Sequence, residues 1–328
     1  MFSNIFSTLT TVVIGIGAAV LLYWVLNKLV SFLPRKAQAN VLPYVFILPA
    51  ILAILAYLVY PTVLTMINSF KDSISEEWVG WDNYSNLFTQ NPYFWESVTN
   101  TLLWVLLVPA VAIIFGLLVA VLVDRLQPRA EKTAKTLIFM PMAISAVAAA
   151  TAWRFIYSVQ IPPHDQLGLL NGIWTMFGAE PVPWLTISDA RFNSILLMVM
   201  MLWAQVGFAM VLLSAAVKGV PTETLEAARI DGANEIQIFR RVVIPQIWPT
   251  IVTVFITVTI TVMKIFDTVY VMTGGSFKTN VIGLMFFQEM FTNFNNGSAS
   301  AIVVVLMLAI VPIMIFQVRQ FRREEAAR

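Results

Sequence analysis

The chain alternates between long uncharged stretches and short charged ones, and this alternation is the first guide to its fold. Residues 11–27 (TVVIGIGAAVLLYWVLN) and 301–318 (AIVVVLMLAIVPIMIFQV) contain no charged side chain. A helix needs about 20 mostly apolar residues to cross a bilayer core, so such runs predict membrane-spanning helices. We expect seven of them, over residues 10–30, 43–65, 98–123, 136–157, 193–217, 243–266 and 301–319.

Composition supports a membrane protein of the all-α class. The chain is 59% hydrophobic and 12% charged, whereas soluble domains carry about 25% charged residues. In lipid a spanning segment must satisfy its own backbone hydrogen bonds, which favours helices. A β-barrel would need alternating segments of about ten residues, and these runs are too long. The first run lacks preceding Lys or Arg, so we expect a genuine membrane helix there and no cleaved signal peptide.

The basic residues predict how the chain is oriented. Lys and Arg concentrate in cytoplasmic connections of membrane proteins. With seven spans, the connections after spans 1, 3, 5 and 7 all lie on one side, and they hold fifteen of the 20 basic residues. The N-terminus is therefore expected outside and the C-terminus in the cytoplasm. The fifteen residues are Lys28, Arg35, Lys36, Arg125, Arg129, Lys132, Lys135, Lys218, Arg229, Arg240, Arg241, Arg319, Arg322, Arg323 and Arg328.

Few residues here could carry catalysis or bind a metal. The chain has no cysteine and a single histidine, His164, which argues against thiolate chemistry and against Cys- or His-based metal sites. No G-x-x-x-x-G-K-[ST] phosphate loop occurs. We therefore expect no cofactor in this chain, and any ATP must be handled by another polypeptide.

One charged segment, residues 219–245 (GVPTETLEAARIDGANEIQIFRRVVIP), lies on the expected cytoplasmic side between spans 5 and 6. Thr222 to Asp231 are mostly good helix formers, and Gly232 permits a turn. Asn234, followed three residues later by Gln237, has the spacing of a capping box. The segment predicts a helix, a tight turn and a second helix at the membrane surface. It is longer than a plain connection requires, which favours insertion into a partner's groove over a purely structural loop.

This segment resembles the E-A-A-x-x-x-G-x(9)-I-x-L-P motif of ABC importer permeases, and it departs mildly just before Pro245, where the family often has Leu. Other stretches resemble sugar permeases of the maltose-permease type, so that about 290 residues are similar to the family. They are VGWDNYSNLF (79–88), FWESVTNTLLW (94–104), LGLLNGIWTMFG (167–178) with its G-x-x-N pattern, and IFDTVYVMTGG (265–275).

The resemblance implies the larger permease subunit of an ATP-driven sugar importer in a bacterial inner membrane, with a type I ABC importer permease fold. Residues 1–42 would be an extra N-terminal helix and its linker, and 43–328 the transmembrane domain. Region 219–245 would be the coupling helix that docks on an ATPase. The implied partners are a second permease subunit, two ATPase subunits that hold ATP and Mg, an extracytoplasmic binding protein and lipid, with no nucleic acid. The motif residues are Glu226, Ala227, Ala228, Asp231, Gly232, Ala233, Phe239 and Pro245.

A substrate path would use the few polar and aromatic groups inside the spans, because such groups are expensive in lipid and usually functional. The family comparison points to spans 4, 5 and 6, and sugars bind aromatic faces together with hydrogen-bonding groups. Packing or lipid contact is an equally strong explanation for Trp203 and Phe208. The candidates are Ser145, Trp203, Gln205, Phe208 and Tyr270.

Several functions remain open at this point. An α-glucoside, maltose or trehalose is the favoured substrate, and glycerol phosphate is the alternative, although the spans lack the central Arg that would suit a phosphate. A secondary transporter or channel would need ion-coupling carboxylates or His within the spans, which are absent from their middles. A membrane partner that docks but transports nothing is a third possibility. A membrane enzyme is disfavoured, since no paired acids or His constellation lies at membrane depth.

Overall fold

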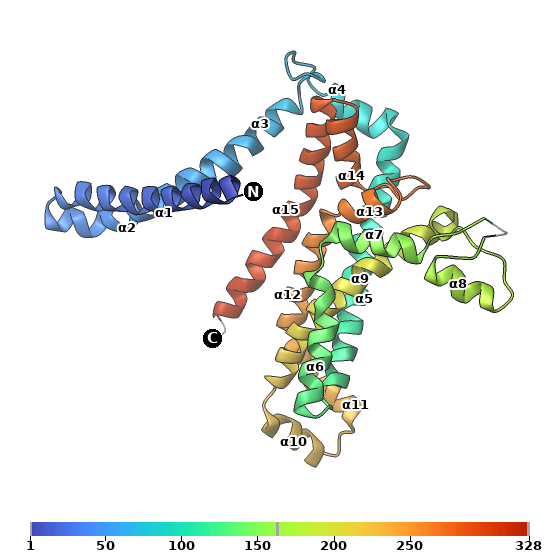
Figure 1. The fold of residues 1–328 in the computed structure, drawn as a ribbon. Coiled ribbons are helices and arrows are strands. Elements are labelled where there is room, and N and C mark those ends of the chain that lie inside the picture. The colour runs from blue at the N-terminus through green and yellow to red at the C-terminus, as the bar shows by residue number, and fades with distance from the viewer. Residues whose placement is uncertain (1, 162–163, 327–328) are drawn as a thin grey trace. The chain divides into compact units, whose positions relative to one another are not determined.

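The computed structural model describes residues 2–161 and 164–326 (Figure 1). Within these residues it is helical almost throughout, and the single β pairing described is an isolated bridge between Lys71 and Trp78. The predicted all-α class is therefore confirmed. The chain forms two compact units, Met1–Ile67 and Asn68–Arg328.

The first unit is a helical hairpin extended by a third helix. α1 (Phe2–Ser31) is followed by α2 (Arg35–Ile54), and the π-helical turn η1 (Leu55–Val59) leads into α3 (Tyr60–Asn68). Pro34 lies between the first two helices with an extended backbone, because its ring removes the N–H that would continue a helix. Tyr23 and Phe46 stack across the hairpin, with ring centroids 5.6 Å apart.

The second unit is built on three long helices, α5 (Pro92–Val123), α9 (Phe192–Lys218) and α12 (Ile244–Met263), with α6 (Pro128–Phe139) packed beside α9. Shorter elements connect them. These are α4 (Asp82–Ser85), η2 (Asn86–Gln90), η3 (Met140–Ala143), α7 (Ala146–Ile156), α8 (Leu169–Met176), η4 (Trp184–Thr186), η5 (Asp189–Arg191), α10 (Thr222–Ile230), α11 (Glu235–Ile238), η6 (Phe239–Val243), α13 (Asp267–Met272), α14 (Ile282–Phe287), η7 (Gln288–Thr292) and α15 (Asn296–Ala326).

Among the described residues, six helices are long and apolar enough to cross a membrane, and a bent pair makes a seventh crossing if it counts as one span. The pair is α6 with η3, then α7, and it corresponds to the expected span 136–157. That segment is not the continuous helix we expected, because the axis turns by 100°. Pro141 starts a tight 3₁₀ turn, and Ile144 and Ser145 are extended, so the backbone bonds of a straight helix cannot form there.

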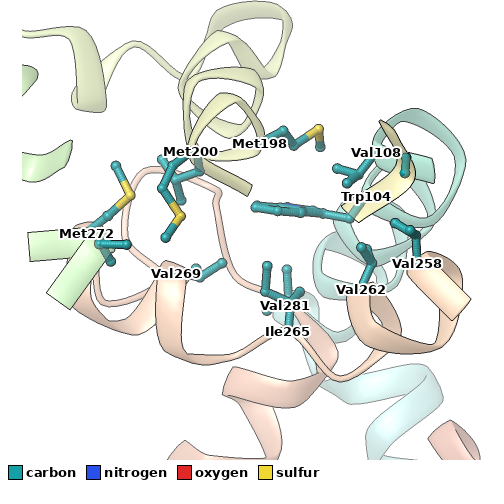
Figure 2. Close-up of a cluster of buried hydrophobic side chains, with 14 of the residues drawn as sticks. Trp104, Val108, Met198, Met200, Val258, Val262, Ile265, Val269, Met272 and Val281 are labelled. Carbon is teal, nitrogen blue, oxygen red and sulfur yellow. The ribbon is translucent and has the colours of Figure 1, made fainter. Parts of the chain in front are cut away.

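The core of the second unit lies where α5, α9 and α12 meet. Trp104 of α5 is fully buried. In Figure 2 its ring reaches across between methionines of α9 and valines of α12. Ala112, Ala120 and Ala209 are also fully buried, and these small side chains let the helix backbones approach closely, as is common in membrane helix packing.

Trp104 offers a test of this packing. Its indole Nε1 is buried without a hydrogen-bond partner, so Trp104→Phe loses only part of the ring's packing and should cost clearly less than Trp104→Ala, which leaves a large cavity and should cost about 3–5 kcal/mol. Thermal unfolding of the purified chain in detergent measures both changes. Trp248→Ala is the matched control, because Trp248 of α12 is 55% exposed. Equal losses for the alanine variants at 104 and 248 would contradict the assignment of the core.

Candidate functional site

The segment 219–245 folds as two short helices joined by a tight turn, as predicted. α10 ends in a Schellman motif: Ala233 N–H donates to the Ala228 carbonyl at 3.1 Å, and Gly232 N–H donates to the Arg229 carbonyl at 3.0 Å. This motif needs a residue in the left-handed region just beyond the helix, and Gly232 has φ +83°. Glycine at this position therefore lets the chain reverse direction without strain.

The second helix begins with the expected capping box. Gln237 N–H donates to Asn234 Oδ1, and Asn234 N–H donates to Gln237 Oε1, each at 2.9 Å. Two N–H groups that would otherwise lack partners are thereby satisfied. α11 continues through the π-helical turn η6 into α12, and Pro245 is the second residue of α12. We call residues 222–238, which form α10, the turn and α11, the helical cap.

An apolar seat holds the helical cap against the long helices. Its buried members are Val220, Ile238, Val243 and Ile247. Side chains from the cap and from the ends of α5, α9 and α12 pack around them. Three motif residues belong to this seat: Ala228, Ala233 and Phe239.

The outer surface of the cap carries four more motif residues. Glu226, Ala227, Asp231 and Gly232 are exposed. Two large apolar side chains are exposed beside them, Ile230 at 86% and Ile236 at 71%. Exposed apolar side chains rimmed by charges are typical of a protein-binding surface.

An ion pair links the two arms of the cap. Arg229 Nε lies 2.9 Å from Glu235 Oε1. Their hydrogen bond raises the pKa of the Arg229 guanidinium above its usual value and lowers the pKa of the Glu235 carboxyl. Both side chains are exposed, and the pair therefore orients the turn more than it stabilises it.

A charge cluster at the base of the cap was not found from the sequence. Lys135 Nζ of α6 lies 2.7 Å from Asp124 Oδ1, which follows α5, and 2.7 Å from Glu131 Oε1. Ser214 of α9 donates to Asp124 Oδ1 at 2.8 Å, and Lys218 bonds to Glu131. We call Asp124, Glu131, Lys135, Ser214 and Lys218 the stem cluster. It joins three helices directly beside the chain segment that enters α10.

The predicted substrate-path residues do not converge on one point. Ser145 is exposed and caps α7 by accepting from Ala148 N–H at 3.2 Å. Trp203 is 40% exposed and meets Trp153 of α7 edge to face at 5.9 Å. Gln205 is 9% exposed and lies two residues further along α9, which places it on nearly the opposite face of the helix.

Of the last two candidates, Phe208 lies about one helical turn beyond Gln205 on α9, and Tyr270 lies on α13. Phe208 is half-buried and packs against the main core. Tyr270 of α13 is 49% exposed and stacks on Phe266, with ring centroids 5.3 Å apart. Three of the candidates share α7 as a neighbour: Ser145 caps it, Trp203 contacts its Trp153, and α13, which carries Tyr270, packs against it.

The helical cap occupies one end of the second unit. In Figure 1, α10 and α11 lie at the end of the long helices α5, α9 and α12 that is far from α4 and α14. The cap and the elements α4 and α14 therefore lie toward opposite ends of the long helices.

Comparison with known proteins gives a consistent family and fold. The model of the family "Binding-protein-dependent transport system inner membrane component" matches residues 132–325. The alpha-glucoside transport system permease protein AglF of Rhizobium meliloti is 42% identical over 335 aligned positions, 98% of each chain. The osmoprotective compounds uptake permease protein GgtC of Synechocystis is 45% identical over 283 residues, 86% of this chain and 100% of that one.

A solved structure has the same fold. It is the crystal structure of a bacterial ABC transporter involved in the import of the acidic polysaccharide alginate, matched with a TM-score of 0.75 at 22% identity. The match covers 88% of this chain and 98% of that chain. At this identity the likeness concerns the arrangement of the helices alone.

Proposed function

The chain belongs to the family of inner membrane components of binding-protein-dependent transport systems, and from that premise we propose that it is the permease subunit of an ATP-driven sugar importer. It is a multi-pass membrane protein, and ATP hydrolysis takes place in a separate ATPase subunit. The observation that carries the proposal is the helical cap, a rigid, exposed surface held on the ends of three long helices.

The cap can act as a coupling helix because its two faces differ. Glu226, Ala227, Asp231 and Gly232 are free to enter a partner's groove, while Ala228, Ala233 and Phe239 anchor the cap to the seat. A push on the outer face therefore moves α9 and α12 as well as the cap. In alternating access, closure of the ATPase pair would draw the cap inward and swing the helices as a rigid body.

The stem cluster extends this connection to α6. Lys135 bridges Asp124 and Glu131, and Ser214 and Lys218 attach α9 to the same two carboxylates. Movement of α9 is thereby passed to α6 and to the bent segment that ends in α7. A network of charges is better suited to fixing the position of α6 against α9 than to stabilising the fold.

Membership of the family supports the kinds of partner subunit that this chain has. Their number and arrangement are part of the proposal. We expect a second permease subunit to complete the path, two ATPase subunits that hold ATP and Mg, and an extracytoplasmic binding protein. The cap would then lie in the cytoplasm, with the N-terminus outside and the C-terminus inside. The division at residues 1–42 and 43–328 would separate an accessory helix from the transport domain.

A neutral sugar of the α-glucoside type is the proposed substrate. The support is the relative named for alpha-glucoside transport, which matches 98% of this chain. Glycerol phosphate is disfavoured, because a phosphate would favour a central Arg in the spans and none is present. The proposed path residues remain Ser145, Trp203, Gln205, Phe208 and Tyr270, whose rings and hydrogen-bonding groups suit a sugar.

Charge reversal at the cap tests the coupling role. Glu226→Lys should abolish co-purification of the ATPase from detergent-solubilised membranes, with at least a tenfold loss, because the docking face would carry the wrong charge. Glu223→Lys is the control, since Glu223 is an exposed residue of the same helix outside the motif. Mass spectrometry and ATP hydrolysis measure the outcome. If both variants retain the ATPase and its stimulated turnover, the cap is only a surface loop.

Removal of the central lysine tests the stem cluster. Lys135→Met should leave ATPase docking intact and lower the sugar imported per ATP by roughly threefold or more, because α6 no longer follows α9. Import and hydrolysis are measured together in vesicles containing the assembled transporter. Lys132→Met is the control, as Lys132 is exposed on the same helix.

A second variant separates uncoupling from misfolding. Lys135→Met removes the nearer lysine from Asp124 and leaves only Lys218 Nζ, 3.7 Å from Asp124 Oδ1, as its cationic partner, which by itself is destabilising. The double variant Asp124→Asn with Lys135→Met removes that charge and should fold normally but remain uncoupled. An unchanged ratio of import to hydrolysis in the double variant contradicts the proposed role.

A further inference from the structure

The loop between α7 and α9 carries a helix with an unusual surface. α8 (Leu169–Met176) lies within a run, residues 166–179, that contains no charged residue. Its exposed side chains are large and apolar, with Leu169 at 61%, Ile173 at 48%, Met176 at 85% and Phe177 at 84% exposed. Side chains of this size do not remain in contact with water on a stable protein without a reason.

The helix is held rigidly by the G-x-x-N pattern of residues 168–171. Asn171 is fully buried and bonds on both sides of the loop: its Nδ2 donates to the carbonyls of Ser158 and Val182, and its Oδ1 accepts from Val182 N–H and Trp184 Nε1, all within 3.0 Å. A Cβ at Gly168 would lie 2.2 Å from the Ser158 carbonyl oxygen. Only glycine therefore permits this close approach.

α8 buries Asn171 and turns most of its large apolar side chains outward, while Leu170 packs against the main core. Thr175 satisfies its hydroxyl within the helix by donating to the carbonyl of Asn171 at 2.9 Å. Trp174 meets Trp184 edge to face at 5.6 Å. Asn171 is thus buried while Leu169, Ile173, Met176 and Phe177 are exposed. This is the reverse of a helix lying on a water-facing surface, and it indicates that the outward medium of α8 is apolar.

The position of α8 indicates which apolar medium this is. The loop leaves α7 and returns into α9, so it emerges where membrane-spanning segments end. In Figure 1, α8 lies off to the side of α5 and α9, beside α7, and not beyond the ends of the long helices. The exposed charged residues Asp165 and Glu180 flank this uncharged run. An uncharged tip with paired tryptophans between charged flanks matches the membrane–water boundary.

We propose that α8 is an interfacial helix, embedded in the boundary between headgroups and acyl chains at the outer face of the bilayer. Leu169, Ile173, Met176 and Phe177 are its lipid contacts, and Asn171 with Gly168 sets its depth by fixing it to the loop. Such helices bind through their buried apolar area. The inference does not depend on the transported substrate.

The absence of cysteine from the chain makes a clean test possible. Single variants Met176→Cys and Phe177→Cys are labelled with a nitrobenzoxadiazole fluorophore, combined with the partner subunits and placed in phosphatidylcholine vesicles. Nitroxide-labelled phosphatidylcholine should quench these labels at least about threefold more than a label at Glu180→Cys, which is exposed just beyond the uncharged run. Aqueous iodide should show the opposite order.

Three results would overturn the proposal. Equal lipid quenching at 176 and 180, with iodide reaching both, places α8 in water. Shielding of the 176 label from lipid and iodide alike assigns the surface to a protein subunit. Loss of iodide access only when the binding protein is added assigns it to that protein. His164→Cys, on the other flank of the uncharged run, repeats the comparison with a second water-facing label.

Discussion

The apolar seat beneath the helical cap is the interaction on which the coupling architecture depends. Val220, Ile238, Val243 and Ile247 join two short, water-facing helices to three helices that face lipid. Short helices in water are marginal on their own, because nucleation fixes several residues for one hydrogen bond. The seat, the Schellman turn at Gly232 and the Asn234 capping box together make the cap rigid enough to transmit a push.

The ion pairs of the same region fix the positions of the turn and the helices more than they stabilise the fold. The Arg229–Glu235 pair orients the turn, and the stem cluster ties α5, α6 and α9 together at the point where α9 leads into the cap. One carboxylate oxygen, Asp124 Oδ2, is buried without a partner, a costly arrangement for a charged group. A cluster retained despite such a cost is consistent with a joint whose geometry matters to function.

Local features of the fold and of the cap could be predicted from the sequence because they depend on neighbouring residues. Spans follow from apolar runs, the turn from Gly232, and the capping box from the spacing of Asn234 and Gln237. The stem cluster could not be predicted, since Asp124 and Ser214 are 90 residues apart and meet only through packing. The bend at Pro141 carried a signal, because proline disfavours a continuous helix. The sequence also indicates that Trp203 and Gln205 lie on opposite faces of α9, because two residues along a helix correspond to about 200° of rotation.

The central claim is that this chain forms half of a sugar path powered by ATP bound to another subunit. The most direct measurement is uptake of a radiolabelled α-glucoside into vesicles that contain the chain, its permease partner and the ATPase. The account predicts uptake only when the binding protein is outside and ATP is present at the ATPase, with no effect of an ion gradient. Uptake driven by an ion gradient without ATP would contradict it and would identify this chain as a secondary transporter.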